Sequence, residues 1–217
     1  MKKQNQKNLY VAVCMLVLFV LWTVAVRLID IKAIGPQGST VGFATLNLLV
    51  HKFTGVHMSL YTITDWLGIV LFVFVIGFGI LGLVQWIKRK HLLKVDYSIL
   101  VLGGFYIVVM AVYVFFEMLV INYRPILING YLEASYPSST TMLVMCVMPT
   151  AIMHFNCRIK NCLLNRCVIF AIVAFIAFMV IGRLVSGVHW FSDIIGGTML
   201  STALVLMYRT IVRAKEQ

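Results

Sequence analysis

Three residues near the C-terminal end of the sequence, Arg183, His189 and Asp193, have the types and spacing of a catalytic group. Asp193 follows His189 by four residues, so both side chains share one face if the segment is helical. A histidine held by a carboxylate can act as a nucleophile or a base, because the carboxylate orients the ring. The cluster interrupts two apolar runs, where charged groups are costly and usually functional.

Two arginines are expected to bind the group that reacts. Arg124 follows the third apolar run, and Arg183 follows the fifth. Neither has an acidic partner close in sequence. Two guanidinium groups on an apolar background can hold a tetrahedral oxyanion such as phosphate. A purely structural ion network among the same charged residues is the alternative.

The start of a helix is expected to complete this site. Pro137 is followed by Ser138, Ser139 and Thr140, which are residue types that favour a helix start. The free N–H groups of a helix N-terminus attract an anion, and the Ser138 hydroxyl can add another donor.

These groups predict a phosphoryl transfer in which His189 is the nucleophile. Its ring would attack phosphorus to give a phosphohistidine, which water then hydrolyses, while Asp193 stabilises the charged ring. The arginines and the helix start would stabilise charge on the transferred group. The sequence has seven acidic residues, too few and too scattered for a Mg²⁺ or Zn²⁺ site, so no metal or other cofactor is expected.

The surrounding sequence indicates a membrane protein. It is 62% hydrophobic and 12% charged, whereas soluble domains average about 45–50% and about 25%. Six stretches are each long enough to cross a hydrocarbon core of about 30 Å. We therefore expect one all-α domain over residues 1–217, a six-span transmembrane bundle with an outward-facing phosphate pocket. The expected spans are 9–29, 65–87, 97–120, 139–157, 166–183 and 190–209.

The net charge of +11 follows the membrane topology. Thirteen of the 18 Lys and Arg residues lie in four short segments that alternate with the apolar runs, as the positive-inside rule requires. Both termini and the loops 88–96 and 158–165 are expected to be cytoplasmic. The loops 30–64, 121–138 and 184–189 are expected to face outward. No nucleic-acid partner is expected, and the first run is expected to remain as a span rather than be removed as a signal peptide.

The first outer loop is long and has apolar residues at helical spacing from Phe43 to Phe53. It is expected to form either a helix that lies in the membrane surface, roofing an entrance for lipid, or a packed helix that closes the bundle. His51 and His57 are expected to be ordinary loop residues, and Asp65 a helix-start residue.

The sequence resembles the type 2 phosphatidic acid phosphatases, also described as lipid phosphate phosphatases, membrane enzymes that share a fold with the vanadium haloperoxidases. The resemblance covers residues 97–209 and rests on three motifs in the order of that family. The matching residues are Arg124-Pro125 for the first motif, Pro137-Ser138 for the second, and Arg183, His189 and Asp193 for the third. The resemblance implies a membrane lipid phosphate as the substrate.

The second motif is degenerate, and this affects the chemistry. The family continues Pro-Ser with Gly-His, where this chain has Ser139 and Thr140. The family uses that histidine to protonate the leaving oxygen, which threonine cannot do at neutral pH. The family also has a lysine seven residues before the first arginine, where this chain has Glu117.

Two hypotheses address the missing acid. Glu117 shares a face with Arg124 if the third span stays helical between them, and it can then replace the histidine as the acid. The interpretation that we favour is that Glu117 simply pairs with Arg124 or Arg183. The second hypothesis concerns the substrate: a phosphate leaving group has a second pKa of about 6, whereas a lipid alkoxide is far more basic. A polyprenyl diphosphate such as undecaprenyl diphosphate is therefore favoured over phosphatidic acid.

The sequence thus predicts a phosphatase that acts on a lipid phosphate or diphosphate at the outer leaflet of a bacterial plasma membrane. The alternatives are a degenerate relative that binds or moves phospholipid headgroups without hydrolysis, and a lipid phosphotransferase. The oligomeric state stays open. The expected catalytic residues are His189 and Asp193, and the expected substrate-binding residues are Arg124, Ser138, Arg183, Ser139, Thr140 and Glu117.

Overall fold

A computed structural model describes residues 2–215 of the chain and confirms the predicted all-α fold with six spans. Each of the six is long and apolar enough to cross a membrane, and the second is a pair of helices interrupted at Gly68. The spans are α1 (Lys2–Leu28), α3 (Met58–Leu67) with α4 (Ile69–Arg89), α5 (Tyr97–Met118), α6 (Ser139–Arg158), α7 (Cys162–Val185) and α8 (Phe191–Ala214).

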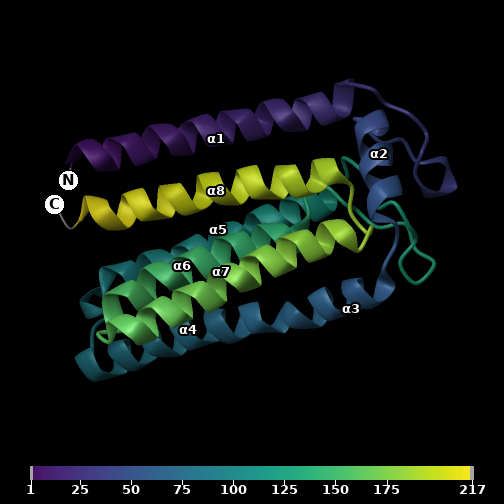
Figure 1. The fold of residues 1–217 in the computed structure, drawn as a ribbon. Helices are drawn as coiled ribbons and strands as arrows, with labels where there is room; N and C mark the ends of the chain where they lie inside the picture. The colour runs from purple at the N-terminus through teal and green to yellow at the C-terminus, as the bar shows by residue number, and fades with distance from the viewer. Residues whose placement is uncertain (1, 216–217) are drawn as a thin grey trace.

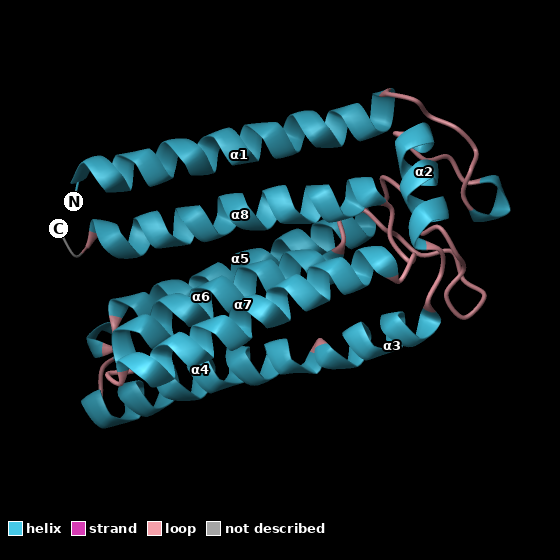
Figure 2. Cartoon of the chain, in the orientation of Figure 1, coloured by secondary structure: helices cyan, strands magenta, loops and turns pink. Residues whose placement is uncertain are grey.

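The spans lie side by side, and α1 packs along α8 (Figure 1). The first residue of α1 and the last residue of α8 lie at one end of the bundle, which we call the terminal end. A shorter helix, α2 (Ala44–Thr54), crosses the opposite end, which holds the longer loops (Figure 2) and which we call the loop end. Two single 3-10 turns, Pro36–Gly38 and Leu92–Lys94, lie in loops.

The second span begins earlier than the sequence indicated. We predicted a loop to residue 64 and a helix start at Asp65, but α3 begins at Met58 and Asp65 lies in its last turn. The polar threonines of this segment do not interrupt the helix. In the structure, Thr62 and Thr64 donate their hydroxyl hydrogens to carbonyl oxygens one turn earlier, which satisfies them within the helix.

The helix α2 closes the loop end by holding the segment between α7 and α8. The buried Asn47 donates to the hydroxyl oxygen of Ser192 and accepts from the Ser192 backbone N–H. His51 Nε2 lies 3.1 Å from the carbonyl oxygen of Gly187. These contacts support the packed helix that closes the bundle. The outer face of α2 is apolar, and Phe53 on that face is 92% exposed.

The loop between α5 and α6 folds into a short antiparallel hairpin. Ile128 and Tyr131 exchange backbone hydrogen bonds, and between them Asn129 and Gly130 have φ angles of 52° and 82°. An Asn-Gly pair favours such a two-residue turn, because both positions need a positive φ.

This hairpin aligns the first motif with the segment that leads into the second. The N–H of Arg124 donates to the carbonyl oxygen of Glu133 at 3.0 Å, and the N–H of Ser135 donates to that of Asn122 at 2.9 Å. Arg124 is therefore held in register beside the residues that precede Ser138.

The apolar core fixes the same segment from the other side. Tyr136 packs against the rings of Phe19 and Phe116, and its hydroxyl lies 2.7 Å from that of Thr23. The first span, which contributes no predicted site residue, thereby positions the entry into α6. Other buried members of this core are Leu102, Val109, Met142, Leu200 and Tyr208.

Candidate active site

The residues predicted to form the site come together at the loop end, inside the protein. Arg124, Ser138, Arg183, His189 and Asp193 are all buried. They come from the hairpin, the start of α6, the last turn of α7, the loop after it and the first turn of α8. Within residues 2–215, no three His, Cys, Asp or Glu side chains gather as metal ligands would.

Several buried polar atoms of this cluster have no hydrogen-bond partner within the described residues. They are Nε and Nη1 of Arg124, Nε of Arg183, Oγ of Ser138 and Nε2 of His189. Buried polar groups are nearly always hydrogen-bonded, and an unpaired one costs about 1–3 kcal/mol. Because the arginine nitrogens and the serine hydroxyl are donors, the set suits an anion with several oxygen acceptors.

Arg183 is held in place by an acid and a hydroxyl. Its Nη2 lies 3.2 Å from Asp65 Oδ1 and donates to Thr140 Oγ1 at 2.5 Å. We expected Thr140 to contact the substrate. In the structure its hydroxyl oxygen contacts Arg183. Since α3, α6 and α7 each contribute one of the three residues, Arg183 also joins three helices at the site.

A tyrosine brings the two arginines together. The guanidinium carbon of Arg183 lies 4.9 Å from the centre of the Tyr61 ring, and that of Arg124 lies 6.0 Å from it. Both distances are in the range of cation–π attraction. Arg124 also pairs with Glu133, whose Oε2 lies 3.1 Å from Arg124 Nε, although the two are not aligned as a hydrogen bond.

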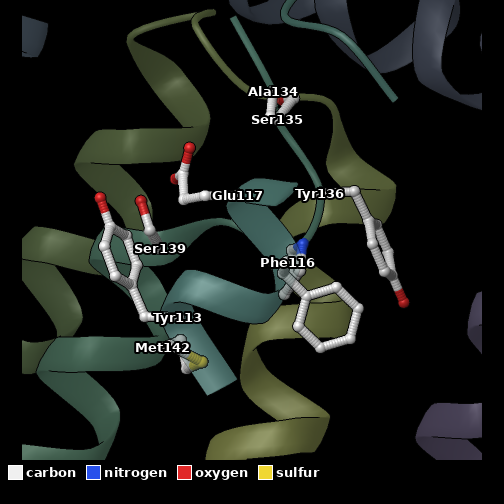
Figure 3. A pocket seen from close by; sticks show the side chains of 9 residues that line it. Tyr113, Phe116, Glu117, Ala134, Ser135, Tyr136, Ser139 and Met142 are labelled. Carbon is white, nitrogen blue, oxygen red and sulfur yellow. The ribbon is translucent and has the colours of Figure 1, made fainter. Parts of the chain in front are cut away.

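Glu117 pairs with neither arginine. The pairing that we favoured from the sequence was wrong, because Asp65 and Glu133 are the acids that reach the two guanidinium groups. Glu117 instead lines a cavity of about 10 Å³ together with Ser135 and Ser139. Figure 3 shows its side chain within this pocket. Such a volume holds about one water molecule. Glu117 is therefore separated from Ser135 and Ser139 by a space of about that size.

The neighbours of His189 fix its tautomer. Its Nδ1 lies 3.2 Å from the carbonyl oxygen of Ser135 and 3.1 Å from the hydroxyl oxygen of the same residue. A carbonyl oxygen can only accept, so Nδ1 carries the hydrogen and Nε2 has the free lone pair. Burial, followed by the charges of Arg124 and Arg183, holds the pKa of His189 well below its ordinary value of 6.5. The ring is therefore neutral near pH 7.

Asp193 reaches His189 through Ser135. We predicted a direct contact from the spacing of four residues, but His189 Nδ1 and Asp193 Oδ2 are 3.9 Å apart. The helix α8 begins only at Phe191, so His189 lies outside the helical geometry that the spacing assumed. Asp193 Oδ2 instead accepts the Ser135 hydroxyl at 2.5 Å and the Trp190 backbone N–H at 2.9 Å.

The sequence analysis missed four residues of this site: Tyr61, Asp65, Glu133 and Ser135. Ser135 lies two residues before the second motif, and extending that motif backwards past Tyr136 was a way to find it. The turn at Asn129-Gly130 was a signal for the register that places Glu133 beside Arg124. Tyr61 and Asp65 are four residues apart in α3 and could be found only once that segment was known to be helical.

A largely apolar groove leads away from the site between α4, α5 and α6. Its volume is about 390 Å³, and its polar end is formed by Asp65, Ser139 and Thr140. Because Thr140 is bonded to Arg183, this end adjoins the cluster of unpaired donors. The groove fits a ligand with an anionic head and an apolar tail. Its apolar lining includes Phe72, Val75, Val109, Met110, Leu143 and Val147.

The low pKa of His189 predicts that stability depends on pH. Because the folded-state pKa lies below the unfolded value of about 6.5, the unfolded chain binds more protons as pH falls below that value. Stability should therefore fall from pH 7 to pH 5, by up to about 1.4 kcal/mol per pH unit from this one group. Thermal unfolding in detergent measures it.

His189→Gln should flatten this pH dependence, since it removes the titrating ring. His91→Gln changes an exposed histidine at the terminal end and serves as the matched control. A dependence that is equally steep in His189→Gln and the wild type would contradict the assignment.

Comparison with known proteins bears on the fold and the family. No curated protein matches the chain in sequence. The fold is similar to that in the crystal structure of the first transmembrane PAP2 type phosphatidylglycerolphosphate phosphatase from Bacillus subtilis, with a TM-score of 0.63 and 17% identity. The match covers 96% of this chain and 98% of that one, and at this identity it shows a shared fold. Residues 105–217, just over half of the chain, match the PAP2 superfamily and include Arg124, Arg183 and His189. The chain therefore belongs to the PAP2 superfamily.

Proposed function

We propose that the protein hydrolyses a lipid phosphate or diphosphate through a phosphohistidine intermediate on His189. The observation that carries this proposal is the set of unpaired buried donors of Arg124, Arg183 and Ser138 around a neutral imidazole whose Nε2 has no partner. A phosphoryl group supplies the acceptors that these donors lack, and its phosphorus is the electrophile that a free Nε2 attacks. Family membership supports the same activity.

The reaction has two steps. In the first, the Nε2 lone pair forms a bond to phosphorus, and the bond from phosphorus to the leaving oxygen breaks. The Nδ1 hydrogen stays on the ring, which becomes positively charged and is stabilised by Ser135 and, through it, by Asp193. In the second step, the oxygen of a water molecule forms a bond to phosphorus, and the bond from phosphorus to Nε2 breaks with its electron pair returning to the ring. One proton of that water passes to solvent, and phosphate and neutral His189 are released. No metal takes part in this scheme, because the two guanidinium groups neutralise the phosphoryl charge.

The apolar groove supports a lipid as the substrate. A phosphoryl group at Arg183 places the rest of the molecule beside Thr140, at the polar end of the groove. An apolar tail then lies along the inner walls of α4, α5 and α6. The groove accommodates either acyl or prenyl chains, so the chemistry of the leaving group must distinguish the two classes.

Leaving-group chemistry favours a diphosphate such as a polyprenyl diphosphate. Thr140 occupies the position of the acid of the family, and its hydroxyl oxygen accepts a bond from Arg183. A phosphate leaving group needs little protonation, because its second pKa is about 6. A lipid alkoxide needs an acid, and Glu117, which is not ion-paired to Arg124 or Arg183, is the candidate on the other side of the water-sized cavity.

We also propose that the loop end faces outward and that the terminal end faces the cytoplasm of a bacterial cell. The support is the charge pattern: the loops at residues 88–96 and 158–165, rich in Lys and Arg, lie at the terminal end with the start of α1 and the end of α8. The substrate would then be taken from the outer leaflet.

The threonine at position 140 is also consistent with a second function, binding of a phospholipid without hydrolysis. The missing histidine at Thr140 is what a degenerate relative would show if it bound phospholipid headgroups without cleaving them. A lipid phosphotransferase would use the same first step and replace water with another acceptor.

The first test is phosphate release from a lipid diphosphate by the purified protein. His189→Ala should lower the rate by at least about 10³-fold, because it removes the nucleophile. His91→Ala, at an exposed position of the terminal end, should leave the rate unchanged. Equal rates in the wild type and His189→Ala would exclude the enzyme, and loss in the variant would exclude the pure binder. An added alcohol that gains the phosphoryl group would reveal a transferase.

Ser135→Ala tests the link between Asp193 and His189. The variant keeps the backbone carbonyl that sets the tautomer but loses the hydroxyl that connects the ring to the carboxylate. A hydrogen bond to a charged group is worth about 1.5–3 kcal/mol, so kcat should fall roughly 10- to 100-fold while KM changes little.

Two further variants make this test specific. Ser135→Thr keeps a hydroxyl and should restore most of the rate. Ser135→Ala combined with Asp193→Asn should be little worse than the poorer single variant, because both act through one contact. Losses that simply multiply would show that Asp193 acts on His189 without Ser135.

Glu117→Gln tests the proposed acid by comparing two substrates. Hydrolysis of a lipid monophosphate should fall by at least about 10²-fold, since its leaving group needs a proton. Hydrolysis of a lipid diphosphate should change by less than about 3-fold, because its leaving group needs little protonation. Full activity of the variant on the monophosphate, with an unshifted pH profile, would rule out the acid role. Faster monophosphate than diphosphate cleavage by the wild type would refute the diphosphate preference.

A further inference from the structure

A second groove lies at the terminal end, far from the candidate active site. Its volume is about 700 Å³, and α5, α6 and α8 contribute to its walls. Three arginines line it: Arg158 at the end of α6, and Arg209 and Arg213 in the last two turns of α8. Its remaining walls include the apolar side chains of Pro149, Ile152, Met153 and Val212.

The positive charge of this groove is only partly balanced. Asp96 is the carboxylate in its lining, and it lies 3.7 Å from Arg158 and 2.9 Å from Arg89, so two arginines share it. Within residues 2–215, Arg209 and Arg213 form no ion pair. Guanidinium groups with so little acid nearby favour an anionic ligand.

The polar side chains at the base of the groove are hydrogen-bonded to one another. Arg158 donates to His154 Nδ1 at 2.8 Å, and so His154 Nε2 carries the hydrogen and donates to the Tyr208 hydroxyl oxygen at 2.7 Å. The Tyr208 hydroxyl donates in turn to the carbonyl oxygen of Ser98 at 3.2 Å. His154 and Tyr208 are buried. This chain of bonds joins α6, α8 and α5 and so fixes the walls. One nitrogen of Arg158 takes part in it, whereas Arg209 and Arg213 do not and stay available to a ligand.

The groove and the active site lie on opposite sides of the membrane. The helix α6 starts beside the phosphate site and ends at Arg158 after 20 residues, a length of about 30 Å. That length equals the thickness of the hydrocarbon core. A lipid headgroup at these arginines therefore belongs to the other leaflet and cannot be the substrate lipid in its reactive position.

The apolar side chains in the walls of the groove favour a lipid over a free anion as the ligand. Pro149 lies nine residues before Arg158, about 13 Å deeper in the bundle, so the apolar part of the groove extends to the depth of acyl chains. A free phosphate would contact only the arginines and would not fill the apolar part of the groove. Basic pockets between transmembrane helices on the cytoplasmic side suit anionic headgroups.

We infer that this groove binds an anionic phospholipid of the leaflet opposite the active site. Its headgroup phosphate contacts Arg158, Arg209 and Arg213, and an acyl chain lies along Pro149, Ile152 and Met153. Bound there, the lipid joins α6 to α8, the two helices that carry the start of the phosphate site and Asp193 at their other ends.

Native mass spectrometry of the purified full-length protein tests this inference. The probes are phosphatidylglycerol and phosphatidylcholine with identical acyl chains. The wild type should retain phosphatidylglycerol in preference. Arg209→Gln combined with Arg213→Gln should weaken its retention roughly 30-fold, since each basic residue near a membrane surface contributes about a fivefold effect. Lys88→Gln combined with Lys90→Gln removes the same charge at the same end but outside the groove, and should bind as the wild type does.

Another variant separates this inference from the proposed enzymatic function. Arg183→Gln disables the proposed phosphate site and should still retain phosphatidylglycerol, whether or not the protein is a phosphatase. Unchanged retention in the Arg209 and Arg213 variant would overturn the inference. So would equal retention of phosphatidylcholine, equal weakening in the Lys88 and Lys90 control, or displacement of the lipid by millimolar inorganic phosphate. If the double variant aggregates, Arg209→Gln alone should show about a fivefold loss, and no loss would again overturn the inference.

Discussion

The central constraint on this structure is the electrostatic repulsion between two guanidinium groups that lie close together inside a membrane protein. Arg124 and Arg183 are both buried and both approach the ring of Tyr61. Like charges repel more strongly in a medium of low dielectric constant. One carboxylate reaches each arginine, Glu133 from the hairpin and Asp65 from α3, but nitrogen atoms on both remain without partners. An anion between them would remove this cost, and this is the physical basis of the phosphate site that we propose.

The remaining elements serve to keep this arrangement fixed. The Ser138 backbone N–H donates to the carbonyl oxygen of Asp193 at 3.0 Å, which locks the start of α6 to the start of α8. The Trp22 indole N–H donates to the carbonyl oxygen of Ser192, so α1 supports α8 at the same level. From the other side, Asn47 of α2 holds Ser192. The spans without reactive residues are therefore structural supports of the site, and this explains why the motifs alone do not define it.

Much of this could be predicted from the sequence, for two physical reasons. Hydrocarbon thickness sets the length of an apolar span, so the six helices follow from hydropathy. A buried charge is rare enough that Arg124, Arg183, His189 and Asp193 stand out in apolar surroundings. The contacts of Tyr61, Asp65 and Glu133 could not be found in this way, because they depend on how separate helices and the hairpin pack. The link from Asp193 to His189 through the Ser135 hydroxyl could not be predicted either, because the helix starts only after the histidine and the hairpin brings Ser135 between them.

The change from histidine to threonine at position 140 is best understood together with Arg183. In the structure the Thr140 hydroxyl oxygen accepts a hydrogen bond from Arg183, so this side chain holds one arginine of the proposed phosphate site. A site with a firmly held arginine and no proton-donating side chain at position 140 stabilises charge on the phosphoryl group but does little for a basic leaving oxygen. Such a site suits substrates whose leaving group is already a stable anion. Threonine at this position therefore weakens the case for a monophosphatase and strengthens the proposal of a diphosphatase. If Glu117 is the acid that we propose, its reach across the small cavity sets how far a monophosphate can still react.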